Sequence, residues 1–259
     1  MKKNKLLLSA KYLLSGMAIC FLLFGCVTEN SNGKVVDKEK SLELHIQMAK
    51  GYIEKGNRES ARLHLQKAFD IKKDSPAATG AMAQLYILEG EPVLAEEQFK
   101  LALKRDKNLT DVHNNYGIFL FNQKRYEESY EEFEKAAADL GFPGRAQALT
   151  NVGRVALNLG NTTRAQAAFE HAIILDRNNP DAYIEVADIN FQKQEYAEAK
   201  KNLDLYSTIA QQSPRSLLLG IRLESIFGNK DQEASLANQL KNRFPYSGEY
   251  LEYKQHHLN

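Results

Sequence analysis

Few side chains in this sequence could take part in covalent or metal chemistry. There are two cysteines, Cys20 and Cys26, and six histidines. Four of the histidines are expected in different helices, without the spacing of metal ligands: His45, His64, His113 and His171. The chain has no glycine-rich phosphate loop, no Gly-x-Ser-x-Gly elbow and no His-Glu-x-x-His motif. We therefore expect no catalytic site, no metal site and no cofactor, and so no enzymatic activity.

Cys26 stands out because it ends an apolar stretch behind a cluster of positive charge. Four lysines lie within the first 11 residues, and residues 13–25 are uncharged. A stretch this short does not span a membrane as a helix, which takes about 20 residues, but it is typical of a secretory signal. The segment Leu23-Phe24-Gly25-Cys26 resembles a bacterial lipobox. In that motif the cysteine thiol receives a diacylglyceryl group, and the chain is cleaved before the cysteine.

Residues 1–25 are therefore predicted to be a lipoprotein signal peptide, with Cys26 as the lipidated residue. Several acyl chains hold a protein stably on a membrane, whereas one chain binds only marginally. Val27 stands where an aspartate would resemble an inner-membrane retention signal. We therefore expect the protein on the periplasmic face of the outer membrane, with residues 26–40 as a flexible tether. The alternative is an uncleaved anchor in which Cys26 has no role.

The rest of the chain repeats itself. Gly56 and Gly90 are 34 residues apart, and Gly160 and Gly228 are twice that distance apart. A period of 34 residues is the signature of tetratricopeptide repeats. Small residues recur near the start of each expected second helix, at Ala61, Ala95, Ser129, Ala165 and Ala199. A bulky apolar residue follows each of them four positions later, at Leu65, Phe99, Phe133, Phe169 and Leu203. This pattern predicts antiparallel helix pairs that pack closely.

The predicted fold is all-α: a tetratricopeptide-repeat solenoid of about six helix-turn-helix repeats in residues 41–247, forming a right-handed superhelix. The units are about 42–75, 76–109, 110–145, 146–179, 180–213 and 214–247. The third unit has two extra residues within 140–144, and we expect this insertion to splay the third and fourth repeats. Residues 248–259 are expected to cap the open end.

Stacked first helices can line a groove that holds a peptide. The predicted groove residues are Ile46, Lys50, Ile53, Gln84, Ile87, Asn114, Ile118, Phe121, Asn122, Arg154 and Asn158. Apolar side chains and amides with few charges suit an amphipathic helix or an extended peptide. The set lacks the Lys/Asn pattern of carboxylate clamps, so capture of an acidic C-terminus is disfavoured. The alternative for each apolar member is that it packs in the helical core.

Charge excludes one class of partner. Residues 1–25 hold four of the 34 basic residues and none of the 33 acidic ones, so the rest of the chain carries a net charge of −3. No basic patch stands out, and we expect no nucleic-acid binding. The acidic pairs at 127–128 and 131–132 share one expected helix face, which we interpret as a solvated face rather than as catalytic carboxylates. No small-molecule substrate is predicted.

Three segments resemble one family: residues 114–128, residues 215–223 (RSLLLGIRL) and residues 244–252 (FPYSGEYLE). With the lipobox and six repeats, the chain resembles the PilF/PilW family of type IV pilus biogenesis lipoproteins, the pilotins of the pilus secretin. The resemblance implies that the protein escorts secretin subunits to the outer membrane and promotes their assembly, without catalysis. Two alternatives stay open: an adaptor lipoprotein in another envelope complex, and an envelope enzyme or its accessory subunit.

Overall fold

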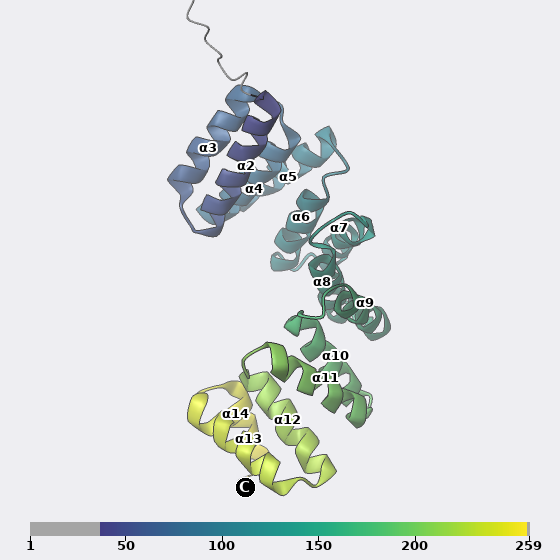
Figure 1. The fold of residues 1–259 in the computed structure, drawn as a ribbon. Helices are drawn as coiled ribbons and strands as arrows, with labels where there is room; N and C mark the ends of the chain where they lie inside the picture. The colour runs from purple at the N-terminus through teal and green to yellow at the C-terminus, as the bar shows by residue number, and fades with distance from the viewer. Residues whose placement is uncertain (1–36, 258–259) are drawn as a thin grey trace, which may run out of the picture. The chain divides into compact units, whose positions relative to one another are not determined.

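The computed structural model describes residues 37–257, which fold into α-helices joined by short turns, with no strand among them (Figure 1). Six helix pairs are followed by a single helix. The pairs are α2 (Lys38–Glu54) with α3 (Arg58–Ile71), α4 (Pro76–Glu89) with α5 (Pro92–Arg105), α6 (Thr110–Asn122) with α7 (Tyr126–Ala138), α8 (Arg145–Asn158) with α9 (Thr162–Leu175), α10 (Pro180–Gln192) with α11 (Tyr196–Ile209), and α12 (Pro214–Phe227) with α13 (Lys230–Arg243). The last helix is α14 (Gly248–His257).

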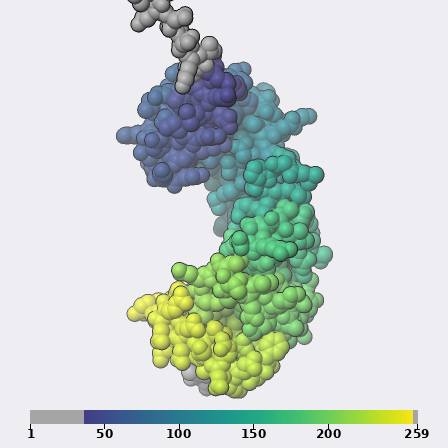
Figure 2. Space-filling view, viewed as in Figure 1, coloured from purple at the N-terminus to yellow at the C-terminus, as the bar shows by residue number. Residues whose placement is uncertain are grey.

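The predicted all-α repeat solenoid is confirmed for residues 42–257, which form one compact unit. Colour follows chain order along this unit in Figures 1 and 2, so each repeat lies beside its neighbours in sequence. Cys26, the predicted signal peptide and residues 26–36 of the predicted tether lie outside the described residues. Residues 38–40, also expected in the tether, are the first turn of α2. No helix among residues 37–257 is both long and apolar enough to cross a membrane.

Each helix pair turns at a residue with a positive φ. Gly56, Gly90, Gly160 and Gly228 have φ values of 71° to 81°. The series continues at Lys124 and Gln194, with φ values of 60° and 64°. For a residue with a Cβ, this left-handed conformation costs about 1–2 kcal/mol of free energy. The turn geometry is therefore kept where glycine is missing, and this explains why the glycine period shows only in part of the sequence.

The core is built from the small and bulky positions that recur in the sequence. The small residues Ala61, Ala95, Ser129, Ala165 and Ala199 are all 0% exposed, and the bulky residues that follow them are at most 5% exposed. The first helices supply the space that these rings need. A Cβ placed on Gly153 of α8 would lie 2.6 Å from Cε1 of Phe169 in α9. Small residues thus set the distance between the two helices of a pair.

The insertion between the third and fourth repeats forms a loop closed by its own backbone hydrogen bonds, and the expected splay of these repeats stays a prediction. Phe142 packs beneath Gly144, where a Cβ would lie 2.7 Å from the ring. Nε of Arg145, the first residue of α8, donates to the carbonyl oxygen of Ala137 at 2.8 Å, which ties the start of α8 to the end of α7. One buried cluster, the central cluster, joins α7 to α10 and includes Phe133, Leu149, Val152, Phe169 and Ile189. The loop folds back on itself, so the two repeats stay in contact.

Candidate functional site

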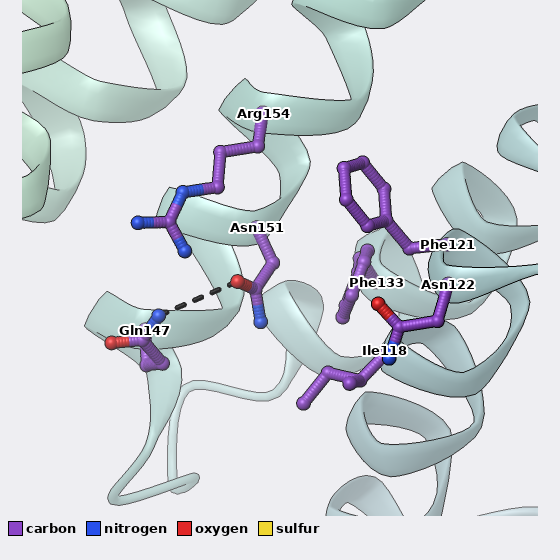
Figure 3. Close-up of a pocket in the computed structure, with 7 residues that line it drawn as sticks. All are labelled: Ile118, Phe121, Asn122, Phe133, Gln147, Asn151 and Arg154. Atoms are coloured by element: carbon purple, nitrogen blue, oxygen red, sulfur yellow. Dashed lines mark hydrogen bonds between the residues drawn. The ribbon is translucent and has the colours of Figure 1, made fainter. Parts of the chain in front are cut away.

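A pocket of about 400 Å³ opens between α6, α7 and α8 (Figure 3). We call it the α6–α8 pocket. Its lining consists of Ile118, Phe121 and Asn122 from α6, Phe133 from α7, and Gln147, Asn151 and Arg154 from α8. Four of the predicted groove residues thus come together here: Ile118, Phe121, Asn122 and Arg154. The other three lining residues were not in the predicted set.

Helix periodicity explains why these residues share one pocket. Residues 118, 121 and 122 lie on one face of α6, and residues 147, 151 and 154 lie on one face of α8. Phe133 of α7 is only 2% exposed, yet its ring forms part of the lining. Gly117 of α6 has no Cβ, and this leaves room for the ring beside α6. The prediction included Arg154 but missed Gln147 and Asn151. These two residues precede Arg154 by seven and three positions, and this helical spacing could have indicated that they share its face.

The polar rim of the pocket is a short chain of side-chain amides. Nε2 of Gln147 donates to Oδ1 of Asn151 at 3.4 Å (Figure 3), and Nδ2 of Asn151 donates to Oδ1 of Asn114 at 3.3 Å. Both hydrogen bonds are longer than the usual 2.9–3.0 Å. Asn151 is only 7% exposed. An amide offers two donor hydrogens and two acceptor lone pairs, so Asn151 keeps hydrogen-bonding capacity that these two long bonds do not use.

Arg154 is the one charged residue in the lining. Its guanidinium pairs with Oδ2 of Asp181 in α10 at 2.7 Å. The two side chains are 37% and 50% exposed, and exposed pairs of this kind contribute about 0–1 kcal/mol. Asp181 therefore holds Arg154 only weakly, and another carboxylate could replace it at little cost.

The remaining predicted groove residues lie elsewhere. Ile46 is buried in the cluster of the first repeat, and Ile53 packs partly against that cluster. Nζ of Lys50 pairs with Oδ2 of Asp111 at 2.5 Å. Ile87 is exposed on α4. Nε2 of Gln84 is buried and has no hydrogen-bond partner among residues 37–257. Nδ2 of exposed Asn158 donates to the carbonyl oxygen of Arg154. None of these lines the α6–α8 pocket, although Asn114 adjoins it through Asn151.

Three histidines that looked isolated in the sequence have close partners. Nδ1 of His45 lies 3.0 Å from Nδ1 of His64, and burial lowers the pKa of His64, with His45 adding to the effect. Nδ1 of His113 lies 2.5 Å from Oε2 of Glu132, and its Nε2 lies 2.9 Å from the carbonyl oxygen of Lys107. Burial opposes ionisation of Glu132, but His113 and Lys135 outweigh it and lower the pKa of that carboxyl. No group of three potential metal ligands occurs within residues 37–257.

Ion pairs join α12, the first helix of the sixth repeat, to α10 in the fifth repeat and to α14. Arg215 of α12 donates to Glu185 at 2.8 and 2.9 Å and to Asp188 at 2.5 Å, both in α10. Burial raises the pKa of Asp188 although Arg215 opposes it. Arg222 of α12 pairs with Glu252 of α14. The charged side chains of Arg215 and Arg222 are thus engaged within the chain.

Known proteins resemble this chain over most of its length. Residues 151–214 match the family model of the tetratricopeptide repeat. The type IV pilus assembly protein PilF of Pseudomonas aeruginosa is 39% identical over 244 residues, which is 92% of this chain and 97% of PilF. The solved structure of P. aeruginosa PilF matches with a TM-score of 0.80 at 38% identity, covering 85% of this chain and 99% of that one. The crystal structure of PilW, a widely conserved type IV pilus biogenesis factor, matches with a TM-score of 0.68 at 25% identity, covering 82% of this chain and 97% of that one.

Proposed function

Because the chain belongs to the PilF family of tetratricopeptide-repeat proteins of type IV pilus biogenesis, we propose that it is a lipid-anchored adaptor that brings the pilus secretin to the outer membrane. The observation that carries this role is the 39% identity over 97% of PilF. The match covers the full set of repeats, whereas a generic repeat signature would match any member of a very large class. A role in pilus biogenesis follows from the family, and the secretin as client is our own assignment.

The α6–α8 pocket supports a protein as the partner. It combines an apolar floor with a rim of amides, which is the composition that suits peptide recognition. Nothing in the described part of the chain assembles a nucleophile, a base and an oxyanion donor around a common point. We therefore assign the protein a binding role in which no bond is made or broken.

The proposed mechanism couples binding to location. Acyl chains on Cys26 would hold the protein in the outer membrane, while the repeats hold the client. Tethering raises the effective concentration of bound secretin subunits at the bilayer and so favours their assembly into a ring. Anchoring and binding reside in different parts of the chain, so each can be removed without the other.

The test is a gene deletion complemented by the wild-type chain, by Cys26→Ala or by Cys20→Ala. Detergent-resistant secretin multimers are measured in outer-membrane fractions. We expect the multimers to disappear on deletion and to return with wild type and Cys20→Ala, but not with Cys26→Ala. Multimers that persist unchanged in the outer membrane of the deletion strain would refute the secretin role. Co-purification would then identify another envelope complex as the client.

A further inference from the structure

His45 of α2 and His64 of α3 meet head-on between the two helices of the first repeat. Their Nδ1 atoms are 3.0 Å apart, which is hydrogen-bond distance. Their ring centroids are 5.3 Å apart, which equals the nitrogen separation plus one ring radius for each imidazole, so both nitrogens lie close to the line between the rings. The ring of Tyr52 stacks on His64 and holds its orientation. Half of 3.0 Å is well short of a metal–nitrogen bond of about 2.0–2.1 Å, so a proton fits on this line and a metal ion does not.

The surroundings of the histidine pair offer it no counter-charge. His64 is 9% exposed, and the residues three and four positions from His45 on α2 are all uncharged. On α3 the charged residue at that spacing from His64 is a cation, Lys67. Helix α4, which packs on α3, carries one carboxylate, and this group of Glu89 pairs with Arg62 at 2.6 Å. Extra positive charge on the pair is therefore not compensated by α2, α3 or α4.

Two imidazoles in this arrangement can share one extra proton but cannot hold two. When both rings are neutral, or when one is protonated, a single N–H lies between the Nδ1 atoms, so one nitrogen donates and the other accepts. When both rings are protonated, both nitrogens carry hydrogen, the hydrogen bond is lost, and two positive charges face each other beside Lys67. Burial lowers the pKa of His64, and His45 and Lys67 add to the effect. The folded first repeat therefore binds fewer protons in acid than the unfolded chain does.

The third repeat has a different pair at the same place. His113 and Glu132 each lie 68 residues, or two repeat lengths, after His45 and His64, and they join α6 to α7 as the first pair joins α2 to α3. A carboxylate thus stands where the first repeat has its second imidazole. A proton added to His113 meets an opposite charge 2.5 Å away, so mild acid strengthens this contact. The two repeats should therefore respond to acid in opposite ways.

From these contacts we propose that the His45–His64 pair is an acid-sensitive latch between the two helices of the first repeat. It holds α2 on α3 while at most one extra proton is bound, and it opens when both rings are protonated. Because the unfolded chain binds more protons in acid, the contribution of the pair to stability is complete above about pH 6.5. Below that pH, the equilibrium constant for opening rises by up to about tenfold per pH unit. Stability in a repeat array is close to a sum of local terms, so the loosening stays in the first repeat and does not depend on the client.

Hydrogen exchange of the full-length chain in detergent, measured by mass spectrometry at pH 7 and pH 5, tests the latch. Each exchange rate is divided by that of an unstructured peptide at the same pH, which gives a protection factor. Two reciprocal variants exchange the pairs: His64→Glu gives the first repeat a histidine–glutamate pair, and Glu132→His gives the third repeat two histidines. His171→Gln on α9 is the matched control, because His171 belongs to neither pair. Circular dichroism at pH 7 confirms that each variant is folded.

We expect the protection of α2 and α3 to fall at least tenfold from pH 7 to pH 5 in the wild type, while that of α6 and α7 changes less than about threefold. His64→Glu should abolish the loss in the first repeat, Glu132→His should produce it in the third, and His171→Gln should behave as wild type. Equal protection of α2 and α3 at both pH values in the wild type overturns the inference, and so does a loss that persists in His64→Glu. If His64→Glu does not fold, His64→Gln decides the same question, because it removes one titrating ring and keeps a neutral hydrogen-bonding side chain.

Discussion

Gly153 shows how little space a single position has in the core. Its missing Cβ leaves room for the ring of Phe169, which would lie 2.6 Å from a methyl group there. Gly153→Ala gains about 1 kcal/mol of helix propensity but overpacks the core by about 1–3 kcal/mol. Because the phenylalanine is 0% exposed, we expect the larger overpacking value, a net loss of about 2 kcal/mol, and a Tm lower by roughly 4–8 °C.

The matched control for this substitution is Gly51 in α2. A Cβ on Gly51 would meet no atom within 4 Å. Gly51→Ala should therefore keep the propensity gain of about 0.5–1 kcal/mol and leave the Tm unchanged or slightly higher. Thermal melts of both variants by circular dichroism check the pair. Shifts of the same sign would show that packing against Phe169 is not what distinguishes the two glycines.

Helix α14 closes the C-terminal end of the solenoid, and two kinds of contact hold it. Tyr250 and Tyr253 pack against the buried residues of α12 and α13, while Arg222 forms an ion pair with Glu252 in which both side chains are 40% exposed. Complete burial of an apolar side chain contributes about 1.5–3 kcal/mol, of which each half-buried tyrosine gains a part, and an exposed ion pair contributes about 0–1 kcal/mol. We therefore expect Tyr250→Ala to lower the Tm more than Arg222→Ala does, as measured by calorimetry. The opposite order would mean that α14 is held mainly by charge.

At the largest scale that the structure describes, residues 42–257 form a row of repeats, each of which packs on its neighbours. Stability in such a row is close to a sum of local terms. Leu149→Ala removes a side chain of the central cluster and should cost about 2–5 kcal/mol. Hydrogen exchange should then speed up in α7 to α10 and stay unchanged in α3 and α13.

Leu240→Ala provides the mirror-image control, because Leu240 is fully buried in the cluster of α12 and α13. It should raise exchange at the C-terminal end and leave α7 and α8 protected. Mass spectrometry of the two variants under identical conditions distinguishes local from global opening. If either substitution accelerates exchange evenly along residues 42–257, the repeats unfold as one cooperative unit.

The sequence by itself determined the helix pairs, because their packing depends on residue size at fixed intervals. Ala61 and Leu65, and their equivalents 34 residues onward, had to face the partner helix for the pair to close. The family was also predicted from segments such as residues 215–223, and the 39% identity to PilF over 244 residues confirms it. Both properties are local or periodic, and one sequence suffices to show them.

Only the tertiary structure decided which first-helix residues form a site. Ile46 and Ile118 occupy equivalent faces of their helices in the predicted groove, yet Ile46 is 7% exposed in a cluster and Ile118 is 40% exposed in a pocket. The difference depends on how neighbouring repeats pack and on how the loop at 140–144 folds back. Gln147 and Asn151 became candidates for the same reason. A pocket is the space left between elements, and that space depends on distances that no single element encodes.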